Sequence, residues 1–145
     1  MSVLQLCDEE PAVVQAETSV ADAIQLMLAR RVGAVAVLDA SGVVAGIFTE
    51  RDVLRKVALS GRDPAATPVR EAMSTPVVLA TAGTTPGEAL AIMVDRHFRH
   101  LPVVDDHGKL LGMLSIRNLL QWRVDEVTQQ LDSLENYVSN DGPGG

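Results

Sequence analysis

A seven-residue stretch that occurs twice constrains this chain more than any other feature. Its first copy is Gly46-Ile47-Phe48-Thr49-Glu50-Arg51-Asp52, and its second is Gly112-Met113-Leu114-Ser115-Ile116-Arg117-Asn118. Each copy runs from apolar residues typical of a strand, through a hydroxyl residue, into a sequence typical of the first turn of a helix. The copies lie 66 residues apart (112 − 46), and they differ at one chemically important place, where Asp52 is replaced by Asn118.

The residues around the two copies repeat as well, which indicates a tandem duplication. Residues 11–15 match residues 76–80 at an offset of 65, and we place one extra residue in the second copy directly after this match. From there the offset is 66. The matching pairs include Met27 with Met93, Asp39 with Asp105, Gly42 with Gly108, and, before the first strands, Cys7 with Met73.

Each repeat predicts the order β-α-β-β-α, so we expect an α/β (α+β) fold of two repeats related by pseudo-two-fold symmetry. Neither repeat covers its own sheet completely, and the pair should therefore fold as one body. The first repeat predicts a lead helix at 2–6, strands at 13–15, 35–38 and 43–48, and helices at 20–31 and 51–60. The second predicts a lead helix at 68–73, strands at 77–80, 101–104 and 110–114, and helices at 86–97 and from 117.

These elements divide the chain into a first repeat at 1–60, a linker at 61–67, a second repeat at 68–120, a heptad helix at 121–140 and a disordered tail at 141–145. The heptad helix rests on an apolar seam with spacings of 4, 3, 4, 3 and 4 residues. Two interpretations remain open: the helix packs on its own repeats, or it pairs with the same helix of a second copy. The seam consists of Leu120, Val124, Val127, Leu131, Leu134 and Val138.

Composition excludes several classes of function. Apolar residues make up 47% of the 145 residues, which is typical of a folded domain rather than a disordered chain. A net charge of −7 argues against nucleic-acid binding, and no apolar run is long enough to cross a membrane. The start lacks the pattern of a signal peptide, and the single Cys7 leaves no partner for an internal disulfide. We therefore expect a cytoplasmic protein without nucleic-acid or membrane partners.

The repeat order, the spacing and the two copies of the motif together resemble a pair of CBS domains, the tandem arrangement called a Bateman module. The resemblance covers residues 2–120, and with the heptad tail the chain is similar to small bacterial stand-alone CBS-pair proteins. It implies a regulatory module, not an enzyme, that binds an adenine nucleotide such as AMP, ADP or ATP between the repeats. NAD(H) and S-adenosylmethionine are alternative ligands. The resemblance also implies a homodimer, formed through the repeats, the C-terminal helix or both, and an effector protein that the sequence does not identify.

Thr49 and Asp52 have two interpretations. A threonine followed three residues later by an acid at a helix start is typical of a capping box, which is purely structural. The same helix start also offers free N–H groups to a phosphate, and a carboxylate can accept both hydroxyls of a ribose. The family resemblance assigns phosphate contact to Thr49 and ribose contact to Asp52. Gly46 would allow the close approach of a ligand to the end of the strand.

The second copy keeps the hydroxyl in Ser115 but has a neutral amide in Asn118, so we predict two unequal sites with the tighter one at Asp52. Arg99 and His100 precede a strand in the second repeat, whereas Gly33 and Ala34 occupy the aligned positions. The resemblance implies that this basic pair reaches the phosphates across the cleft. The sequence thus predicts one main site that borrows from both repeats.

For the adenine, the resemblance implies backbone groups before the two long helices and apolar side chains of the motif. No cofactor is obligatory, magnesium is an optional companion of the nucleotide, and no metal site is expected. A scaffold without a ligand is the alternative from another class, and an enzyme acting on the nucleotide is a third. The residues assigned to the adenine are Gln15, Thr18, Thr81, Thr84, Ile47 and Met113.

Overall fold

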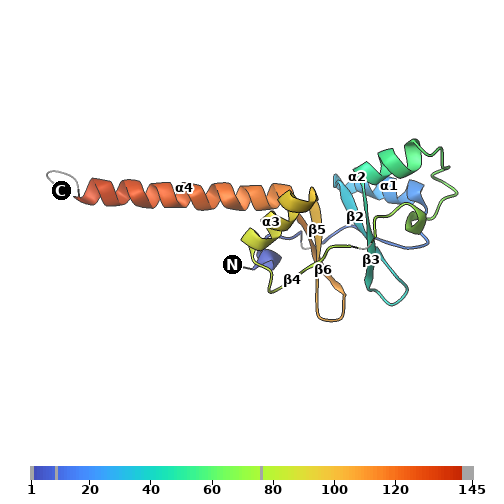
Figure 1. Ribbon diagram of the computed structural model, residues 1–145, viewed down its shortest axis with the longest axis horizontal. Coiled ribbons are helices and arrows are strands. Elements are labelled where there is room, and N and C mark those ends of the chain that lie inside the picture. The colour runs from blue at the N-terminus through green and yellow to red at the C-terminus, as the bar shows by residue number, and fades with distance from the viewer. Residues whose placement is uncertain (1, 9, 76, 142–145) are drawn as a thin grey trace.

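The fold consists of two three-stranded sheets that lie side by side and one long helix that extends away from them (Figure 1). The computed structural model describes residues 2–8, 10–75 and 77–141. The first repeat contains β1 (Val13–Gln15), α1 (Val20–Arg30), β2 (Ala34–Leu38), β3 (Val44–Thr49), α2 (Glu50–Asp52) and a π-helical segment, η2 (Val53–Ala58). The second contains β4 (Ala80–Thr81), α3 (Pro86–Arg96), β5 (His100–Val104), β6 (Leu110–Ser115) and α4 (Ile116–Asp141). Short 3₁₀ helices, η1 (Val3–Gln5) and η3 (Val69–Glu71), precede the two repeats.

Both sheets have the same topology, with a parallel pair followed by an antiparallel hairpin. Val14 pairs with Val37 in the first sheet, and Ala80 pairs with Val103 in the second. Both differences equal 66 (80 − 14 and 103 − 37), so the extra residue of the second copy lies before Ala80. The sequence comparison placed it after this position and predicted a strand at 77–80, which is wrong. The offset of 65 aligns similar apolar residues. In the structure, however, the alignment follows burial, because Val14 and Ala80 are the buried residues of the two parallel strands.

Helices α1 and α3 begin and end in the same way. Ser19 caps α1 by accepting a hydrogen bond from the backbone N–H of Asp22, and Thr85 caps α3 by accepting one from Glu88. Hydroxyl residues suit this position because they satisfy N–H groups that have no partner within the helix. Arg31 and His97 then stop the helices in the left-handed region, with φ of 54° and 59°. His97 and His100 are therefore not on one helix face, as expected from the sequence.

The segments before the two repeats are exchanged between the two cores. Val3 packs in the core of the second repeat with Leu101 and Leu114, whereas Val69 packs in the core of the first repeat with Phe48. The backbone continues this exchange, because Ser74 forms a bridge with Ile47 and Asp8 forms one with Met113. The two repeats are thereby interlocked, a feature that the prediction of consecutive repeats does not contain.

Gly46 and Gly112 are required by this exchange. A Cβ atom on Gly112 would lie 2.7 Å from Cβ of Cys7, and one on Gly46 would collide with the side chain of Met73. Real Cβ atoms do not approach other atoms so closely. The sequence suggested that Gly46 leaves room for a ligand, but in the structure the crossing segment occupies this place.

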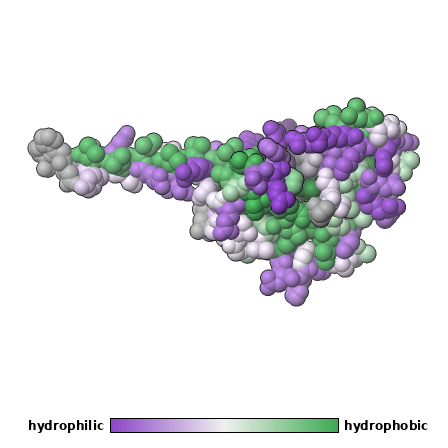
Figure 2. All heavy atoms as spheres, in the orientation of Figure 1, coloured by the Kyte–Doolittle hydropathy of each residue, from purple (hydrophilic) through white to green (hydrophobic). Residues whose placement is uncertain are grey.

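The closing segments of the repeats differ from each other. The first begins as α2 and continues as the π helix, in which the N–H of Leu59 bonds to the carbonyl of Leu54 at 3.1 Å. The second is one continuous helix, α4, so the predicted division at residue 120 does not interrupt the backbone. α4 projects beyond the sheets, and its seam residues are exposed to solvent (Figures 1 and 2). The interpretation that this seam packs on its own repeats is therefore wrong. Of the predicted disordered tail, residues 142–145 lie outside the described residues.

Candidate functional site: a basic cleft between the repeats

In the first copy of the motif, Thr49 and Asp52 form a capping box. The N–H of Thr49 donates to Oδ2 of Asp52 at 3.0 Å, and the N–H of Asp52 donates to Oγ1 of Thr49 at 3.3 Å. The threonine hydroxyl also donates to the same carboxylate oxygen, at 3.2 Å. The structural interpretation of this spacing is thus realised in the molecule. Whether the pair also contacts a ligand stays a prediction.

The other oxygen of Asp52 is bound from the crossing segment and from one turn further along the helix. Ser74 donates its hydroxyl to Oδ1 at 2.8 Å, and Nζ of Lys56 lies 3.5 Å from the same atom. Lys56 also donates to the carbonyl of Met73 at 3.0 Å. Asp52 is only 4% exposed. The carboxylate that the sequence assigned to a ribose is therefore buried and surrounded by partners from its own chain.

The second copy uses its polar groups differently. Ser115 accepts a hydrogen bond from the N–H of Asn118 at 3.1 Å, which caps the first turn of α4. The amide nitrogen of Asn118 donates to the carbonyl of Leu6 at 2.9 Å. By the repeat offset, Trp122 stands where the first repeat has Lys56 (56 + 66). Asn118 therefore has no equivalent of the Lys56 ammonium one turn along the helix, and it is only half-buried.

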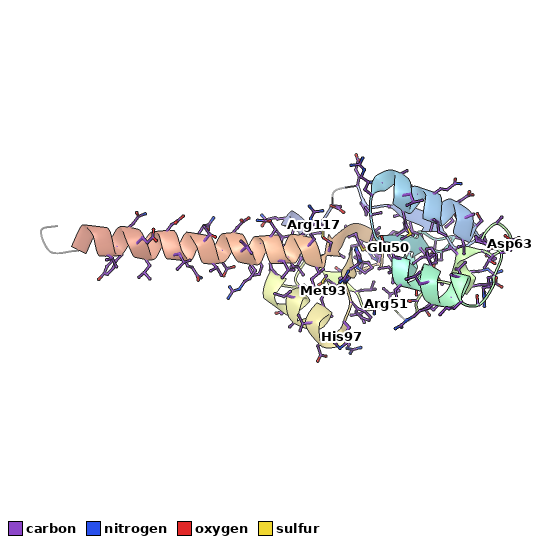
Figure 3. All side chains as sticks on the ribbon, turned by 90° about the horizontal axis from the view of Figure 1, so that it is seen from above. Glu50, Arg51, Asp63, Met93, His97 and Arg117 are labelled. Carbon is purple, nitrogen blue, oxygen red and sulfur yellow. The ribbon has the colours of Figure 1, made fainter. Side chains whose placement is uncertain are left out.

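Asn118 lines a cleft of about 860 Å³ between the repeats, which we call the inter-repeat cleft. The second repeat contributes the predicted residues Arg99, His100, Met113, Ser115 and Asn118, together with Arg117. From the first repeat come the end of α1, the start of β2 and Glu50, and Cys7, Asp8, Glu10 and Ala12 come from the segment before β1. Glu50 and Arg117 lie near the centre of the molecule in Figure 3, where the two repeats meet.

The electrostatics of this cleft favour an anion. It is lined by the side chains of four arginines, which are Arg30, Arg31, Arg99 and Arg117, and by three acids, which are Asp8, Glu10 and Glu50. The local balance of +1 (4 − 3) contrasts with the net charge of −7 for the chain. An acidic protein that gathers arginines at one concave site has the local charge needed to hold a phosphate.

His100 belongs to the second repeat and lies against the first. Its ring faces Gly33, and a Cβ atom on Gly33 would be 3.2 Å from Cε1 of His100. Burial lowers the pKa of His100 below its usual value of 6.5, with a further lowering by Arg99, while Glu50 and Asp8 act in the opposite direction. The absence of a side chain at Gly33 thus gives the imidazole its space, and the ring is neutral in the free protein at pH 7.

The remaining predicted residues lie outside this cleft. Gln15 donates its N–H to Oγ1 of Thr18 at 3.1 Å, and Thr81 donates in the same way to Thr84 at 3.0 Å. These hydrogen bonds close equivalent turns before α1 and α3. The carbonyl of Thr18 also accepts from the N–H of Val69 at 2.7 Å. Contact of these residues and of Ile47 with an adenine stays a prediction.

Several cleft residues were missing from the sequence prediction. From the sequence, Arg30 and Arg31 indicate only cations that complement the end of a helix, but both line the cleft. Arg117 lies within the repeated motif itself, and this position is the sequence signal that could have identified it as a cleft residue. Cys7 and Asp8 arrive through the exchanged segment, which the sequence does not reveal. Burial and the charge of Asp8 raise the pKa of the Cys7 thiol to about 11, so it is protonated at neutral pH.

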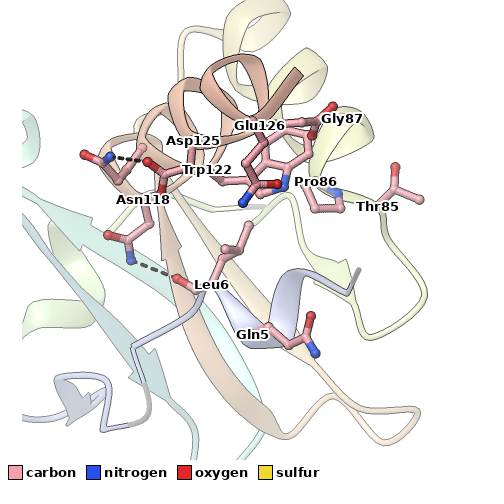
Figure 4. A pocket seen from close by; sticks show the side chains of 11 residues that line it. Gln5, Leu6, Thr85, Pro86, Gly87, Asn118, Trp122, Asp125 and Glu126 are labelled. Atoms are coloured by element: carbon pink, nitrogen blue, oxygen red, sulfur yellow. Dashed lines mark hydrogen bonds between the residues drawn. The ribbon is translucent and has the colours of Figure 1, made fainter. Parts of the chain in front are cut away.

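A second hollow, the Trp122 groove, lies on the other side of Asn118 (Figure 4). It has a volume of about 810 Å³ and runs between the start of α3, the η1 helix and the first turns of α4. Trp122, Asp125 and Glu126 line it from α4. Its acidic wall distinguishes it from the inter-repeat cleft and makes it less suited to a phosphate.

The described residues offer neither a cluster of metal ligands nor a membrane-spanning helix. Within residues 2–8, 10–75 and 77–141, three or more His, Cys, Asp or Glu side chains nowhere come together in a way that would hold a metal ion. Across the same residues, none of the helices combines the length and the apolar character required to cross a bilayer.

With this geometry established, comparison with known proteins identifies the family. The model of the CBS domain matches residues 3–59 and again residues 69–125. The chain therefore belongs to the CBS-domain family and is a tandem CBS pair, a regulatory module. The resemblance drawn from the repeated motif and the expected fold class are both confirmed.

Solved structures and curated relatives agree with this assignment. A CBS-domain protein from Burkholderia ambifaria has a TM-score of 0.79 and 36% identity, covering 86% of this chain and 95% of the other. CBSX2 in complex with AMP has a TM-score of 0.74 and 25% identity, covering 86% and 96%. A 17.7 kDa protein from Acidianus ambivalens is 35% identical over 97% of this chain and 84% of its own length. This chain spans only 61% of mitochondrial CBSX3 from Arabidopsis thaliana, at 34% identity over 84% of this chain.

Proposed function

We propose that this chain is a non-enzymatic sensor that binds an adenine nucleotide in the inter-repeat cleft. The observation that carries the proposal is that four arginines and His100 line the same cleft as Ser115 and Asn118, in a chain of net charge −7. Phosphate groups need such a local excess of donors and positive charge. AMP in the complex of CBSX2 supports an adenosine ligand.

Each part of the cleft has a role that its chemistry supports. At the start of α4 the hydroxyl of Ser115 is available to a phosphate, and Arg99 and Arg117 supply charge. Because the amide nitrogen of Asn118 is bound to Leu6, its oxygen is the atom that accepts a ribose hydroxyl. Met113 offers an apolar surface to the adenine.

The same cleft discriminates among adenosyl ligands. S-adenosylmethionine carries a positive sulfonium group, which the positive balance of the cleft, four arginines against three acids, disfavours by like-charge repulsion. AMP, ADP, ATP and NAD(H) all carry phosphates that these arginines can neutralise. We therefore expect the phosphorylated compounds to bind and S-adenosylmethionine to bind more weakly.

Transmission of the signal begins at the same residues. Ser115 and Asn118 belong to the start of α4, so ordering of this turn by a ligand acts directly on the helix that projects from the repeats. A change in α4 or in the geometry of a dimer would then be available to an effector protein. This is the regulatory output that we propose for the module.

A thermal-shift and calorimetric panel tests the proposal. AMP, ADP, ATP, NADH and S-adenosylmethionine are each added with and without magnesium. A ligand at about 100 times its Kd stabilises the fold by about 2.7 kcal/mol. A phosphorylated adenosine compound that stabilises the protein supports the proposal. Lack of a shift with every compound would instead favour a scaffold, and formation of a product would favour an enzyme.

The repeats supply a matched control for the location of the site. Arg117 and Arg51 occupy the same position of the motif, but only Arg117 lines the inter-repeat cleft among the described residues (Figure 3). Arg117→Ala should weaken nucleotide binding about tenfold, because a charge-assisted hydrogen bond contributes roughly 1.5 kcal/mol or more. Arg51→Ala should leave affinity unchanged. An equal loss in both variants would place the ligand elsewhere.

A further inference from the structure

α4 carries two apolar stripes, and they face in different directions. The first stripe, Leu119 and Trp122, packs toward the second repeat, with Leu119 fully buried and Trp122 half-buried. The second is the heptad seam, which begins one residue later and is rotated by roughly a third of a turn, since each helical residue advances about 100°. One stripe thus attaches α4 to its own repeats, and the seam points elsewhere.

The seam is exposed over its whole length. Its six side chains are between 38% and 59% exposed, although all of them are Leu or Val. Figure 2 shows the apolar side chains following one edge of the projecting helix, with polar side chains along the other. From Leu120 to Val138 the seam extends about 27 Å at 1.5 Å per residue. A continuous apolar strip of this kind on a helix that leaves its own domain indicates a partner helix.

The seam is complementary to a reversed copy of itself. In an antiparallel pair, Val124 lies opposite Leu134 of the second copy, because the paired residue numbers have a constant sum (124 + 134 = 258). The same sum pairs Val127 with Leu131 and Leu120 with Val138. Every layer then joins one valine to one leucine, so the pairing fills each layer with a similar volume. The six seam residues are all used, and none remains outside the pair.

Charge selects the antiparallel orientation over the parallel one. Residues 116–128 carry two arginines and two acids and have a balance of zero, whereas residues 129–141 carry three acids and no base. A parallel pair would set the two acidic halves side by side. An antiparallel pair sets each acidic half beside the neutral half and opposes the two helix dipoles. It also brings Arg123 beside the exposed ring of Tyr137 on the second copy, a cation–π arrangement.

We propose that α4 pairs with α4 of a second copy of this chain as an antiparallel two-stranded coiled coil centred near residue 129. The two CBS pairs then lie at opposite ends of the paired helices. The Leu120 end of each seam lies next to the Asn118 turn, so the pair joins the two inter-repeat clefts through one continuous helical element.

The mass of the full chain in solution tests the pairing. At a concentration on the order of 100 μM, suited to a seam of fewer than three heptads, light scattering should give twice the chain mass of 15.4 kDa. Leu131→Glu with Leu134→Glu should halve this mass. Ser133→Glu with Asn136→Glu adds the same charge on the exposed polar face and should leave the dimer intact. A wild-type monomer, or a dimer that survives the Leu131→Glu and Leu134→Glu changes, would overturn the proposal.

Disulfide exchange tests the orientation. Two forms of the chain are mixed in a Cys7→Ala background, one with Val127→Cys and the other, carrying an affinity tag, with Leu131→Cys. Antiparallel pairing should yield the mixed disulfide as the main product in a glutathione buffer. Parallel pairing would yield the two like-with-like disulfides, and this result would overturn the proposed orientation. Far-UV circular dichroism of every variant verifies that the repeats remain folded.

Discussion

Lys56 and Asp52 form an ion pair with 3.5 Å between Nζ and Oδ1, one turn apart in the closing segment of the first repeat. The second repeat has Trp122 and Asn118 at the same two positions. The two copies of the motif are therefore unequal, because one holds a buried carboxylate with its own cation and the other presents a neutral amide to a basic cleft. This contrast favours the second copy as the ligand site, whereas the sequence alone favoured the first.

We expect Asp52→Ala to destabilise the fold. The substitution removes the capping box and leaves Ser74 and Lys56 without their shared acceptor. Loss of a cap and of a buried hydrogen-bond partner costs about 2 kcal/mol. The melting temperature should fall by roughly 4–8 °C for a chain of this size. Thermal unfolding of the ligand-free protein measures it, and an unchanged melting temperature would contradict the structural role of Asp52.

Asn118→Ala should act mainly on nucleotide affinity, whereas Asp52→Ala acts mainly on stability. The change removes the amide oxygen that we propose as the acceptor of a ribose hydroxyl, which corresponds to a loss of roughly 2- to 10-fold in nucleotide affinity at 0.5–1.5 kcal/mol per hydrogen bond. Calorimetric titration of Asn118→Ala and Asp52→Ala at a temperature where both are folded compares the two copies. A larger loss of affinity in Asp52→Ala would restore the first copy as the main site.

Repeat architecture was readable from the sequence because periodicity and turn residues are local signals. The hairpin of the second repeat was predicted at 101–104 and 110–114 and is found at His100–Val104 and Leu110–Ser115. The exchange of the segments before the repeats was not predicted, because it depends on which core buries Val3 and Val69. The segments that carry Val3 and Val69 are similarly apolar and similarly spaced from their repeats, so the sequence does not reveal which core each one enters.

The candidate site was partly predictable for the same reason. Arg99, His100 and Asn118 stood out because they break the similarity between the repeats, and the structure brings them into one cleft. Arg30 and Arg31 could not be recognised, because their role depends on the end of α1 facing the second repeat. The partners of Asp52 were also hidden, since Ser74 reaches it from 22 residues away.

Alanine at the two motif glycines should reveal how tightly the crossing segments pack. Gly112→Ala places a methyl group 2.7 Å from Cβ of Cys7 and 3.3 Å from a backbone carbonyl, neither of which moves freely. Gly46→Ala meets the flexible end of Met73. We expect a loss of about 2–3 kcal/mol for Gly112→Ala and a smaller one for Gly46→Ala.

Gly87→Ala is the matched control, because its added methyl group meets no atom within 4 Å and Gly87 lies in α3. Alanine should stabilise this helix by about 0.5–1 kcal/mol. Urea unfolding of the three variants gives the order. If Gly112→Ala were as stable as the wild type, the packing of Cys7 against β6 would be looser than the structure indicates.

Nucleotide binding should strengthen as the pH falls, and His100 is the expected cause. Burial and Arg99 hold the pKa of His100 below 6.5 in the free protein, and a phosphate beside the ring raises it in the complex. Binding then takes up a proton between these two pKa values, so affinity rises as the pH falls through that interval. Above the pKa of the complex, the ring is neutral in both states and its contribution to the pH dependence vanishes.

Calorimetry from pH 5.5 to 8 in buffers of different ionisation enthalpy measures the proton uptake directly. His100→Gln should abolish it, whereas His107→Gln, on the exposed turn between β5 and β6, should not. An affinity and a proton uptake that are the same in His100→Gln and the wild type would exclude contact between the imidazole and the phosphate.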